Sequence, residues 1–199
     1  MRWLKLSVVA VFALLWGSPV VFAADFGSKS QLHIRTGQVS GSFSGATSGS
    51  LISSTGLDLE YEVFQNRHRA LLFRSAAFFD LKQNRAIYTY AGMGSNYYFL
   101  STGPLVDTTD GATQFTVTPK YRYYWGWDLG LSQSEVVPKV IGATYTTNID
   151  GGLHLGAIYQ ATRAIGVEAQ LGYSRGYGFT TVSAATSVLK MLFGVSVYF

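Results

Sequence analysis

The chain has 199 residues, no cysteine and a formal net charge of +4, so its length suits a single domain, and disulfide or thiol chemistry is excluded. Charged residues make up 13% of the chain and aromatic residues 15%, whereas a soluble domain usually has about a quarter charged residues. The mean hydropathy of +0.18 is too low for a bundle of transmembrane helices but allows a barrel, in which only alternate residues face lipid.

Residues 1–23 have the features of a secretory signal. Arg2 and Lys5 give a positive start, residues 8–16 are apolar, and a small residue stands at the cleavage position. The apolar stretch is too short to span a membrane comfortably, so a membrane anchor is the less favoured interpretation. We expect residues 24–199 to form a single exported domain.

The mature chain opens with an expected strand at residues 31–43. Its apolar side chains change phase after Gly37, and this slip of one residue predicts a β-bulge. Residues 40–55 contain seven serines and three glycines, a composition typical of a loop. We expect this loop to be extracellular.

The clearest alternation follows at residues 56–64, where leucine, tyrosine and valine alternate with acids. The acids are Asp58, Glu60 and Glu62. Alternate side chains of a strand point to opposite faces, so the three acids share one face. Residues 70–80 are expected to return as the second strand of a hairpin, which brings Arg74 close to the acids.

Two further strands are expected at residues 87–99 and 114–131, with a loop at 100–113 between them. The outward residues expected for the first are Ile87, Thr89, Ala91, Met93, Tyr97 and Phe99. The second alternates over its whole length, with Lys120 and Arg122 on the inward face. Its outward tyrosines and tryptophans are typical of an interfacial aromatic girdle.

The strand count depends on residues 138–147 and 151–160. If they form one strand the chain has eight, and if they form a hairpin it has ten; a bacterial barrel is expected to have an even number. Residues 165–173 follow as a strand with Glu168 inward, and residues 174–187 have the composition of a loop.

The last strand, at residues 187–199, has one fully apolar face and ends on an aromatic residue. The apolar face carries Leu189, Met191, Phe193, Val195, Val197 and Phe199, and Lys190 lies on the other face. A soluble chain seldom ends on an unprotected apolar strand, because an open edge invites pairing with other chains. In a closed barrel this strand would pair with the first and leave no edge.

This ending resembles the terminal strand of bacterial outer-membrane proteins, in which a final Phe, with aromatic or apolar residues at alternate positions before it, is the assembly signal. The matching residues are Phe199, Tyr198, Val197 and Phe193. Together with the alternation along the chain, the ending is similar to the small OmpA-, OmpX- and OmpW-like barrels. The resemblance implies an all-β fold, a transmembrane antiparallel up-and-down β-barrel in the cell outer membrane. It also implies contact with lipid and lipopolysaccharide, and insertion by the barrel-assembly machinery.

The lumen of so small a barrel is just wide enough for side chains to fill. The charges expected there are Asp58, Glu60, Glu62, Arg74, Lys120, Arg122, Glu168 and Lys190, with Arg35 as a further candidate. Unpaired charges in such an interior would be costly. We therefore expect these residues to form a lumenal charge network.

The sequence predicts no catalytic, metal or cofactor site. His33 and His154 lack the serine two residues later that the lipid A deacylases of this size class carry, and no histidine pair has ligand spacing. Gly92 and Gly94 do not extend to a dinucleotide-binding fingerprint. The basic residues form no run longer than 67–69, so nucleic-acid binding is not expected.

We therefore expect a non-enzymatic barrel with a structural, adhesive or envelope-protective role. The loops at residues 40–55, 131–138 and 174–187 would exercise it, since a rigid scaffold leaves loops free to carry function. A narrow channel for small or apolar solutes is the main alternative. A lipid A-modifying enzyme and a soluble lipocalin-like carrier are less favoured, and the sequence does not indicate an oligomeric state.

Overall fold

The computed structural model describes residues 30–45, 49–66, 68–80, 85–99, 106–110, 113–117, 119–136, 144–162, 164–179 and 184–199. The predicted signal segment lies outside these residues. The long strands are β1 (Ser30–Gly45), β2 (Gly49–Phe64), β3 (Arg69–Asp80), β4 (Arg85–Tyr98), β7 (Tyr121–Val136), β8 (Thr144–Gln160), β9 (Ile165–Gly178) and β10 (Ala184–Tyr198). The short strands are β5 (Val106–Asp110) and β6 (Thr113–Val117). No helix in the described part of the chain is long and apolar enough to cross a membrane.

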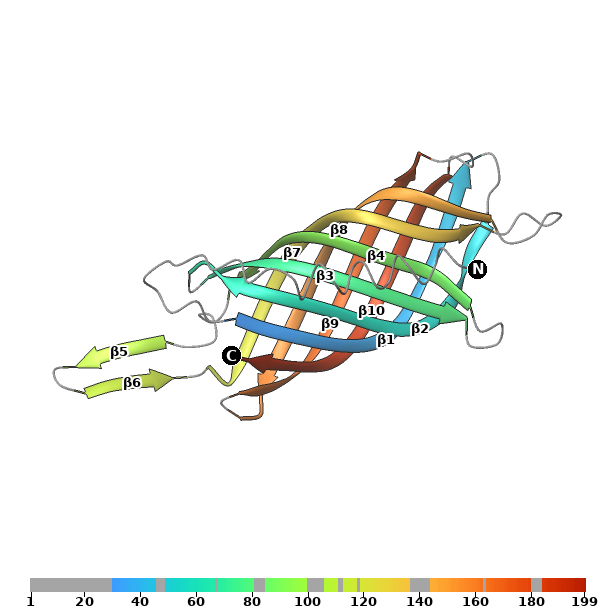
Figure 1. Ribbon diagram of the computed structural model, residues 1–199. Helices are drawn as coiled ribbons and strands as arrows, with labels where there is room; N and C mark the ends of the chain where they lie inside the picture. The colour runs from blue at the N-terminus through green and yellow to red at the C-terminus, as the bar shows by residue number, and fades with distance from the viewer. Residues whose placement is uncertain are drawn as a thin grey trace.

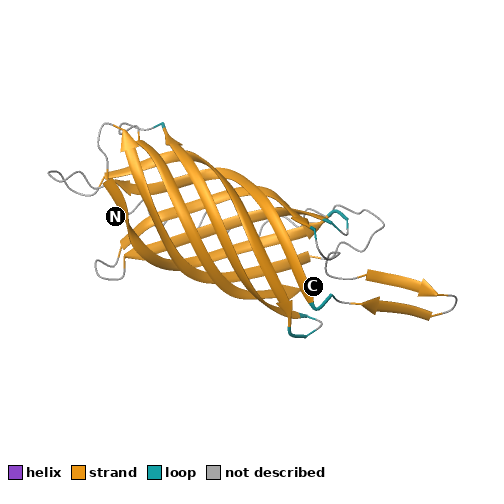
Figure 2. Ribbon diagram, turned by 180° about the vertical axis from the view of Figure 1, so that it is seen from behind, coloured by secondary structure: helices purple, strands orange, loops and turns teal. Residues whose placement is uncertain are grey.

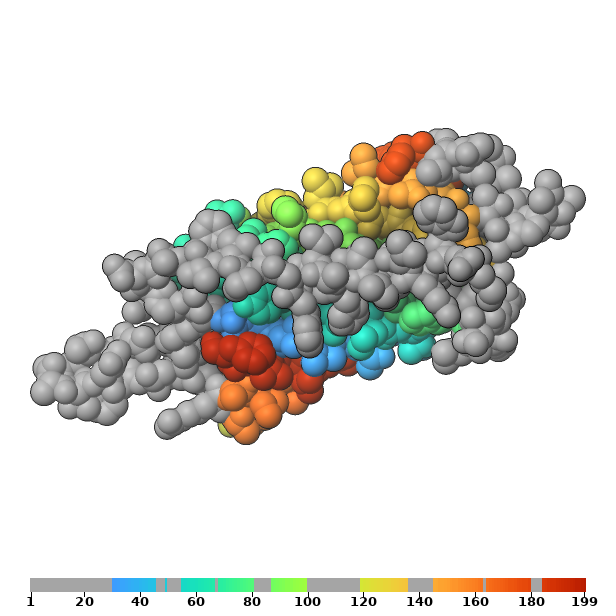
Figure 3. All heavy atoms as spheres, in the orientation of Figure 1, coloured from blue at the N-terminus to red at the C-terminus, as the bar shows by residue number. Residues whose placement is uncertain are grey.

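The long strands form a closed antiparallel barrel in the order β1-β10-β9-β8-β7-β4-β3-β2 (Figures 1 and 2). β1 closes the ring against β10, from Gln31 opposite Tyr198 to Gly45 opposite Ala184. The blue atoms of β1 and the red atoms of β10 accordingly lie side by side in Figure 3. Because the ring has no edge strand, the apolar terminal strand is not left open to pairing. The predicted up-and-down barrel is confirmed.

The barrel has eight strands because β8 is continuous. Asn148 and Asp150, at the proposed break, pair with Ser132 and Gly130 of β7. The chain therefore makes one long strand where the sequence left a hairpin open. Residues 137–143 lie outside the described residues.

A separate hairpin corrects two predictions between β4 and β7. The expected loop at 100–113 contains β5, and β6 takes the first residues of the expected strand at 114–131. β5 and β6 pair from Val106 opposite Val117 to Asp110 opposite Thr113, beyond the barrel end that holds the C-terminus (Figures 1 and 2). The barrel strand begins only at Tyr121, after Pro119, which cannot donate a ladder hydrogen bond.

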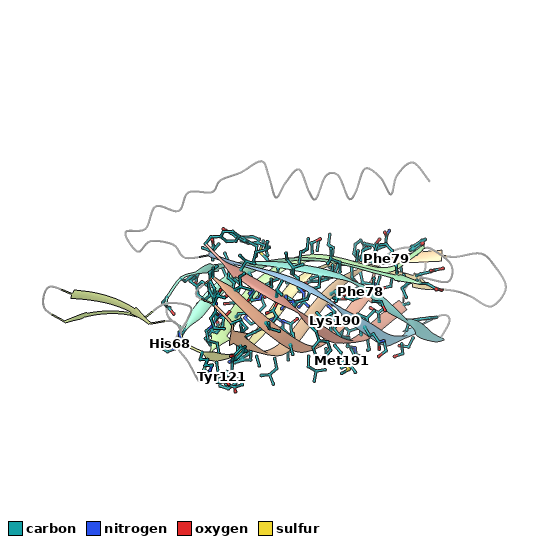
Figure 4. The ribbon with its side chains drawn as sticks, turned by 90° about the horizontal axis from the view of Figure 1, so that it is seen from below. His68, Phe78, Phe79, Tyr121, Lys190 and Met191 are labelled. Carbon is teal, nitrogen blue, oxygen red and sulfur yellow. The ribbon has the colours of Figure 1, made fainter. Side chains whose placement is uncertain are left out.

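Side chains alternate between a mostly polar interior and an apolar exterior. On β10 the neighbours Lys190 and Met191 are 2% and 50% exposed, and Figure 4 shows them on opposite sides of the barrel wall. The phases expected for residues 56–64, 165–173 and 187–199 match the structure. In β4 the expected phase holds from Thr89 to Tyr97. The outward assignment of Ile87 was wrong: it is 3% exposed, because a register shift between Phe78 and Phe79 of β3 interrupts the alternation there. An exterior this apolar suits lipid rather than water.

At the barrel end opposite the C-terminus, the strands are longer than the sequence indicated. Most of the expected loop at 40–55 belongs to β1 and β2, and β7, β9 and β10 take most of 131–138 and 174–187. The change of phase expected near Gly37 is wrong, because Val39 and Phe43 point inward in phase with Arg35. The inner face of β1 carries the polar His33 and Arg35 before Gly37 and the apolar Val39 and Phe43 after it. This change of side-chain type along one face looks like a slip of one residue in the sequence. A register shift relative to β2 occurs later, between Val39 and Gly41.

Candidate functional site in the barrel lumen

Two apolar clusters and a charged layer lie along the described lumen, beside further buried polar side chains such as Asn148 and Asp150 of β8. Toward the end opposite the C-terminus lies an apolar cluster of Val39, Phe43, Ala76, Phe78, Tyr88, Tyr90, Ala184, Val188 and Leu192. Toward the C-terminal end lies a smaller cluster of Ala70, Tyr98, Tyr124 and Ile158, with Phe64 packed against it. On the inner face of β3, Arg74 comes between Ala70 and Phe78. A charged layer therefore separates the two apolar clusters.

Arg35 of β1 is fully buried in this charged layer. Its guanidinium donates from Nε to Asp58 Oδ1 (2.9 Å), from Nη2 to Glu60 Oε2 (2.5 Å) and from Nη1 to the Tyr124 hydroxyl (3.1 Å). The register sets the first contact, because Arg35 lies directly opposite Asp58. A buried charge is tolerated only when such partners compensate for lost water.

Arg74 of β3 connects the same carboxylates to the other side of the ring. It donates from Nε to Asp58 Oδ2 (2.7 Å), from Nη1 to Asp128 Oδ2 (3.3 Å) and from Nη2 to Gln170 Oε1 (2.9 Å). Asp58 thus bridges two guanidinium groups with its two oxygens. Since β9, which carries Gln170, lies across the ring from β3, this cluster ties opposite walls together.

His154 of β8 connects Asp128 of β7 to Asn96 of β4. Its Nδ1 lies 3.2 Å from Asp128 Oδ2 and its Nε2 lies 2.6 Å from Asn96 Oδ1. The Asn96 amide in turn donates to Glu60 Oε1 (2.9 Å) and to Glu62 Oε1. Gly126 makes this approach possible, because a Cβ there would overlap His154 and Asn96. A glycine inside a strand often marks such a close approach.

His33 of β1 lies between two carboxylates. Its Nδ1 is 2.6 Å from Glu168 Oε2, and its Nε2 is 3.3 Å from Glu62 Oε2. Glu62 also accepts a hydrogen bond from the Tyr98 hydroxyl (2.6 Å). All of these side chains are buried, so the contacts are shielded from water.

The structure places seven of the eight expected network residues in the interior. These are Asp58, Glu60, Glu62, Arg74, Arg122, Glu168 and Lys190. Lys120 was assigned wrongly: it is exposed in the segment before β7, with its Nζ 5.6 Å from the centre of the Tyr159 ring. Lys120 lies outside the barrel wall because the strand starts one residue later.

Two of the seven are held by neutral groups in the described contacts. Arg122 donates to Gln31 Oε1 (3.3 Å) and Gln160 Oε1 (2.9 Å) and lies 4.5 Å from the centre of the Tyr198 ring. Lys190 Nζ lies 4.8 Å from the centre of the Tyr90 ring. Cation–π contacts and amide acceptors thus supplement the ion pairs that the sequence predicted.

The predicted charge network left out several functional groups of the layer. The missed residues are His33, Tyr90, Asn96, Tyr124, Asp128, His154 and Gln170. The period-2 phase of His33 relative to Arg35, of Tyr124 and Asp128 relative to Arg122, and of Gln170 relative to Glu168 was a sufficient signal that these four face inward. Tyr90 and Asn96 alternate with the outward residues expected for β4. The phase carried no information on which of them meet, because the partners come from different strands.

The layer contains acid–histidine pairs but not the arrangement of a hydrolase. Within the described residues, both imidazoles contact carboxylates or an amide, as given above, and not a hydroxyl nucleophile. A catalytic histidine acts on a neighbouring nucleophile and on a substrate that can reach it. The side chains of His33 and Glu62 are 0% exposed, so the geometry favours an internal bracing role.

Comparisons with known proteins agree on the fold. No protein-family model and no curated protein matches the chain. Among solved structures, the crystal structure of Neisserial surface protein A (NspA) has a TM-score of 0.54 and 16% sequence identity, covering 83% of this chain and 96% of that chain.

Two other solved structures are more distant. The N-terminal β-barrel domain of Pseudomonas aeruginosa OprF has a TM-score of 0.46 and 15% identity, covering 85% of this chain and 97% of that one. Ail of Yersinia pestis, in complex with a heparin analogue, has a TM-score of 0.46 and 10% identity, covering 85% and 99%. The closed ring, the apolar exterior and the similarity to NspA give one conclusion: this chain is an eight-stranded barrel with the fold of the small bacterial outer-membrane proteins.

Proposed function

We propose that the protein is a non-enzymatic structural barrel of the outer membrane whose lumen is closed to solutes. One observation carries this proposal: large side chains fill the lumen and are almost inaccessible. The largest side chains below 2% exposure include Arg35, Arg122, Tyr88, Tyr98 and Tyr124. An eight-stranded ring leaves room for side chains and little else.

The charged layer argues against a channel. A conducting path would have to open the Arg35 and Arg74 contacts with Asp58, which are 2.7 to 2.9 Å long. Removing one partner of a buried pair costs about 3–5 kcal/mol. Separating the buried partners would likewise leave uncompensated charges in the lumen, so the layer favours a rigid plug over a pathway for small or apolar solutes.

A structural or adhesive role would use the strand ends opposite the C-terminus. β9 continues there to Gly178, with Tyr173, Tyr177 and Phe179 exposed. The Arg175 guanidinium lies 5.4 Å from the centre of the Tyr177 ring. Aromatic and arginine side chains are common at binding hot spots, so this rigid rim supplies a surface for attachment.

Planar-bilayer recording tests whether the lumen conducts ions. The refolded mature chain should give no stable single-channel steps, while a water-filled porin in the same membrane serves as the positive control. A Phe78→Ala/Tyr88→Ala variant, which trims the apolar cluster, tests whether the plug is responsible for closure. Stable steps from the wild-type barrel, confirmed as folded by heat-modifiable gel mobility, would rule the proposal out.

A second assay addresses catalysis. The folded protein is incubated with lipid A and with a peptide mixture, and the products are analysed by mass spectrometry. We expect no mass change in either substrate. Turnover that disappears in His33→Gln or His154→Gln would show that the barrel is an enzyme.

A further inference from the structure

We propose that His33, Glu60 and Glu62 form a site for a divalent transition-metal ion inside the barrel. Each residue offers one ligand atom, and these atoms all lie within 4.8 Å of one another. The three side chains are 0% exposed. They come from two paired strands, with His33 directly opposite Glu60, so the closed sheet fixes their spacing. The site does not depend on the role proposed above for the whole barrel.

The orientation of His33 is an independent indication of a cation. Its Nδ1 donates to Glu168 Oε2 at 2.6 Å, while Nε2 has no hydrogen-bond partner. Metal-binding histidines commonly donate their second ring N–H to a carboxylate, which fixes the tautomer and directs the other nitrogen at the metal. Glu168 therefore acts as a positioning residue for the His33 ligand.

In this tautomer the lone pair of Nε2 faces Glu62 Oε2 at 3.3 Å. Two electron-pair donors at this distance repel each other unless a cation lies between them. The cation can be a proton, which makes His33 an imidazolium, or a metal ion. A metal ion uses three ligands where a proton needs two, and Glu60 supplies the third within the same 4.8 Å cluster.

Asn96 supplies a fourth ligand. Its amide lies against both carboxylates and against His154 Nε2. Rotating the amide by half a turn exchanges its oxygen and nitrogen, which presents Oδ1 to the metal and an N–H to His154 Nε2. One imidazole, two carboxylates and an amide oxygen suit Zn²⁺ or Mn²⁺ better than Mg²⁺.

The test is metal retention by the whole mature chain. The protein is refolded in detergent with Zn²⁺, Mn²⁺ or Mg²⁺, freed of unbound metal by gel filtration, and measured by elemental mass spectrometry. We expect about one Zn²⁺ or Mn²⁺ per folded chain and no Mg²⁺, since the ligand set includes imidazole. His33→Gln should lower retention at least roughly tenfold, and Glu168→Gln by a similar factor through loss of orientation.

His68→Gln is the matched control, because His68 is exposed in the turn between β2 and β3 and should leave retention unchanged. Each variant is first checked for folding by heat-modifiable gel mobility. If His33→Gln fails to fold, the wild-type stoichiometry decides alone. Wild-type protein that retains no Zn²⁺ or Mn²⁺, or a folded His33→Gln variant that retains as much as His68→Gln, would overturn the proposal.

Discussion

Replacing Arg35 with methionine should destabilise the barrel severely. The change leaves Asp58 and Glu60 without the guanidinium that lies 2.9 and 2.5 Å from them. All three side chains are 0% exposed, so water cannot replace the lost donors. Breaking a buried pair by removing one partner costs about 3–5 kcal/mol.

Lys190→Met is the matched control, since it also replaces a buried cation with methionine. The described contacts of Lys190 are with the rings of Tyr88 and Tyr90, at 5.3 and 4.8 Å. Desolvated cation–π contacts are worth roughly 2 kcal/mol. We therefore expect Lys190→Met to cost at least about 1–2 kcal/mol less than Arg35→Met.

Urea unfolding in detergent micelles, followed by the fluorescence of the β7 tryptophans, measures both costs. With a slope of about 2 kcal/mol/M, Arg35→Met should lower the midpoint by about 2 M. Adding Glu60→Gln should recover part of the loss, because residues in one network couple. Equal midpoints for Arg35→Met and Lys190→Met would refute the assignment of Arg35 to the centre of the network.

Three further outcomes test the register and the lipid-facing surface. Deleting Phe199 should reduce the folded fraction in membranes more than Lys190→Ala does, as measured by heat-modifiable mobility; equal fractions would remove Phe199 as an assembly signal. Gly94→Ala should cost about 1–3 kcal/mol in urea unfolding, because its Cβ would overlap the Trp127 carbonyl. Gly151→Ala should be neutral, since the nearest atom to its Cβ lies at 3.7 Å; equal effects of the two glycine changes would contradict the inward packing of Gly94. Brominated lipid should quench the two β7 tryptophans, which are 44% and 40% exposed, more than aqueous acrylamide does; the reverse order would contradict a lipid-facing exterior.

Local alternation was sufficient to predict which face most residues take. The acids of β2 and Lys190 of β10 point inward as expected, because successive side chains of a strand must lie on opposite faces. The apolar ending at Phe199 indicated ring closure for a similar reason, since an open edge of that composition would not be tolerated. Neither inference required knowledge of a distant part of the chain.

Strand ends were harder to predict from composition. The serines and glycines of residues 40–55 suggested a loop, yet β1 and β2 extend through most of that range. Small polar residues can continue a ladder when a neighbouring strand supplies the hydrogen bonds. The same uncertainty at strand ends misplaced Lys120, which precedes the first residue of β7.

Only the tertiary structure decided which inward residues meet. His33 and Glu168 are separated by 135 positions in the sequence and lie 2.6 Å apart. His154 reaches Asn96 across 58 positions. The sequence by itself determined the fold class, the polar lumen and the terminal closure, because these depend on the two-residue period of a strand. The partners within the lumen depend on the register of each strand and on closure of the ring, which bring together side chains that no local pattern relates.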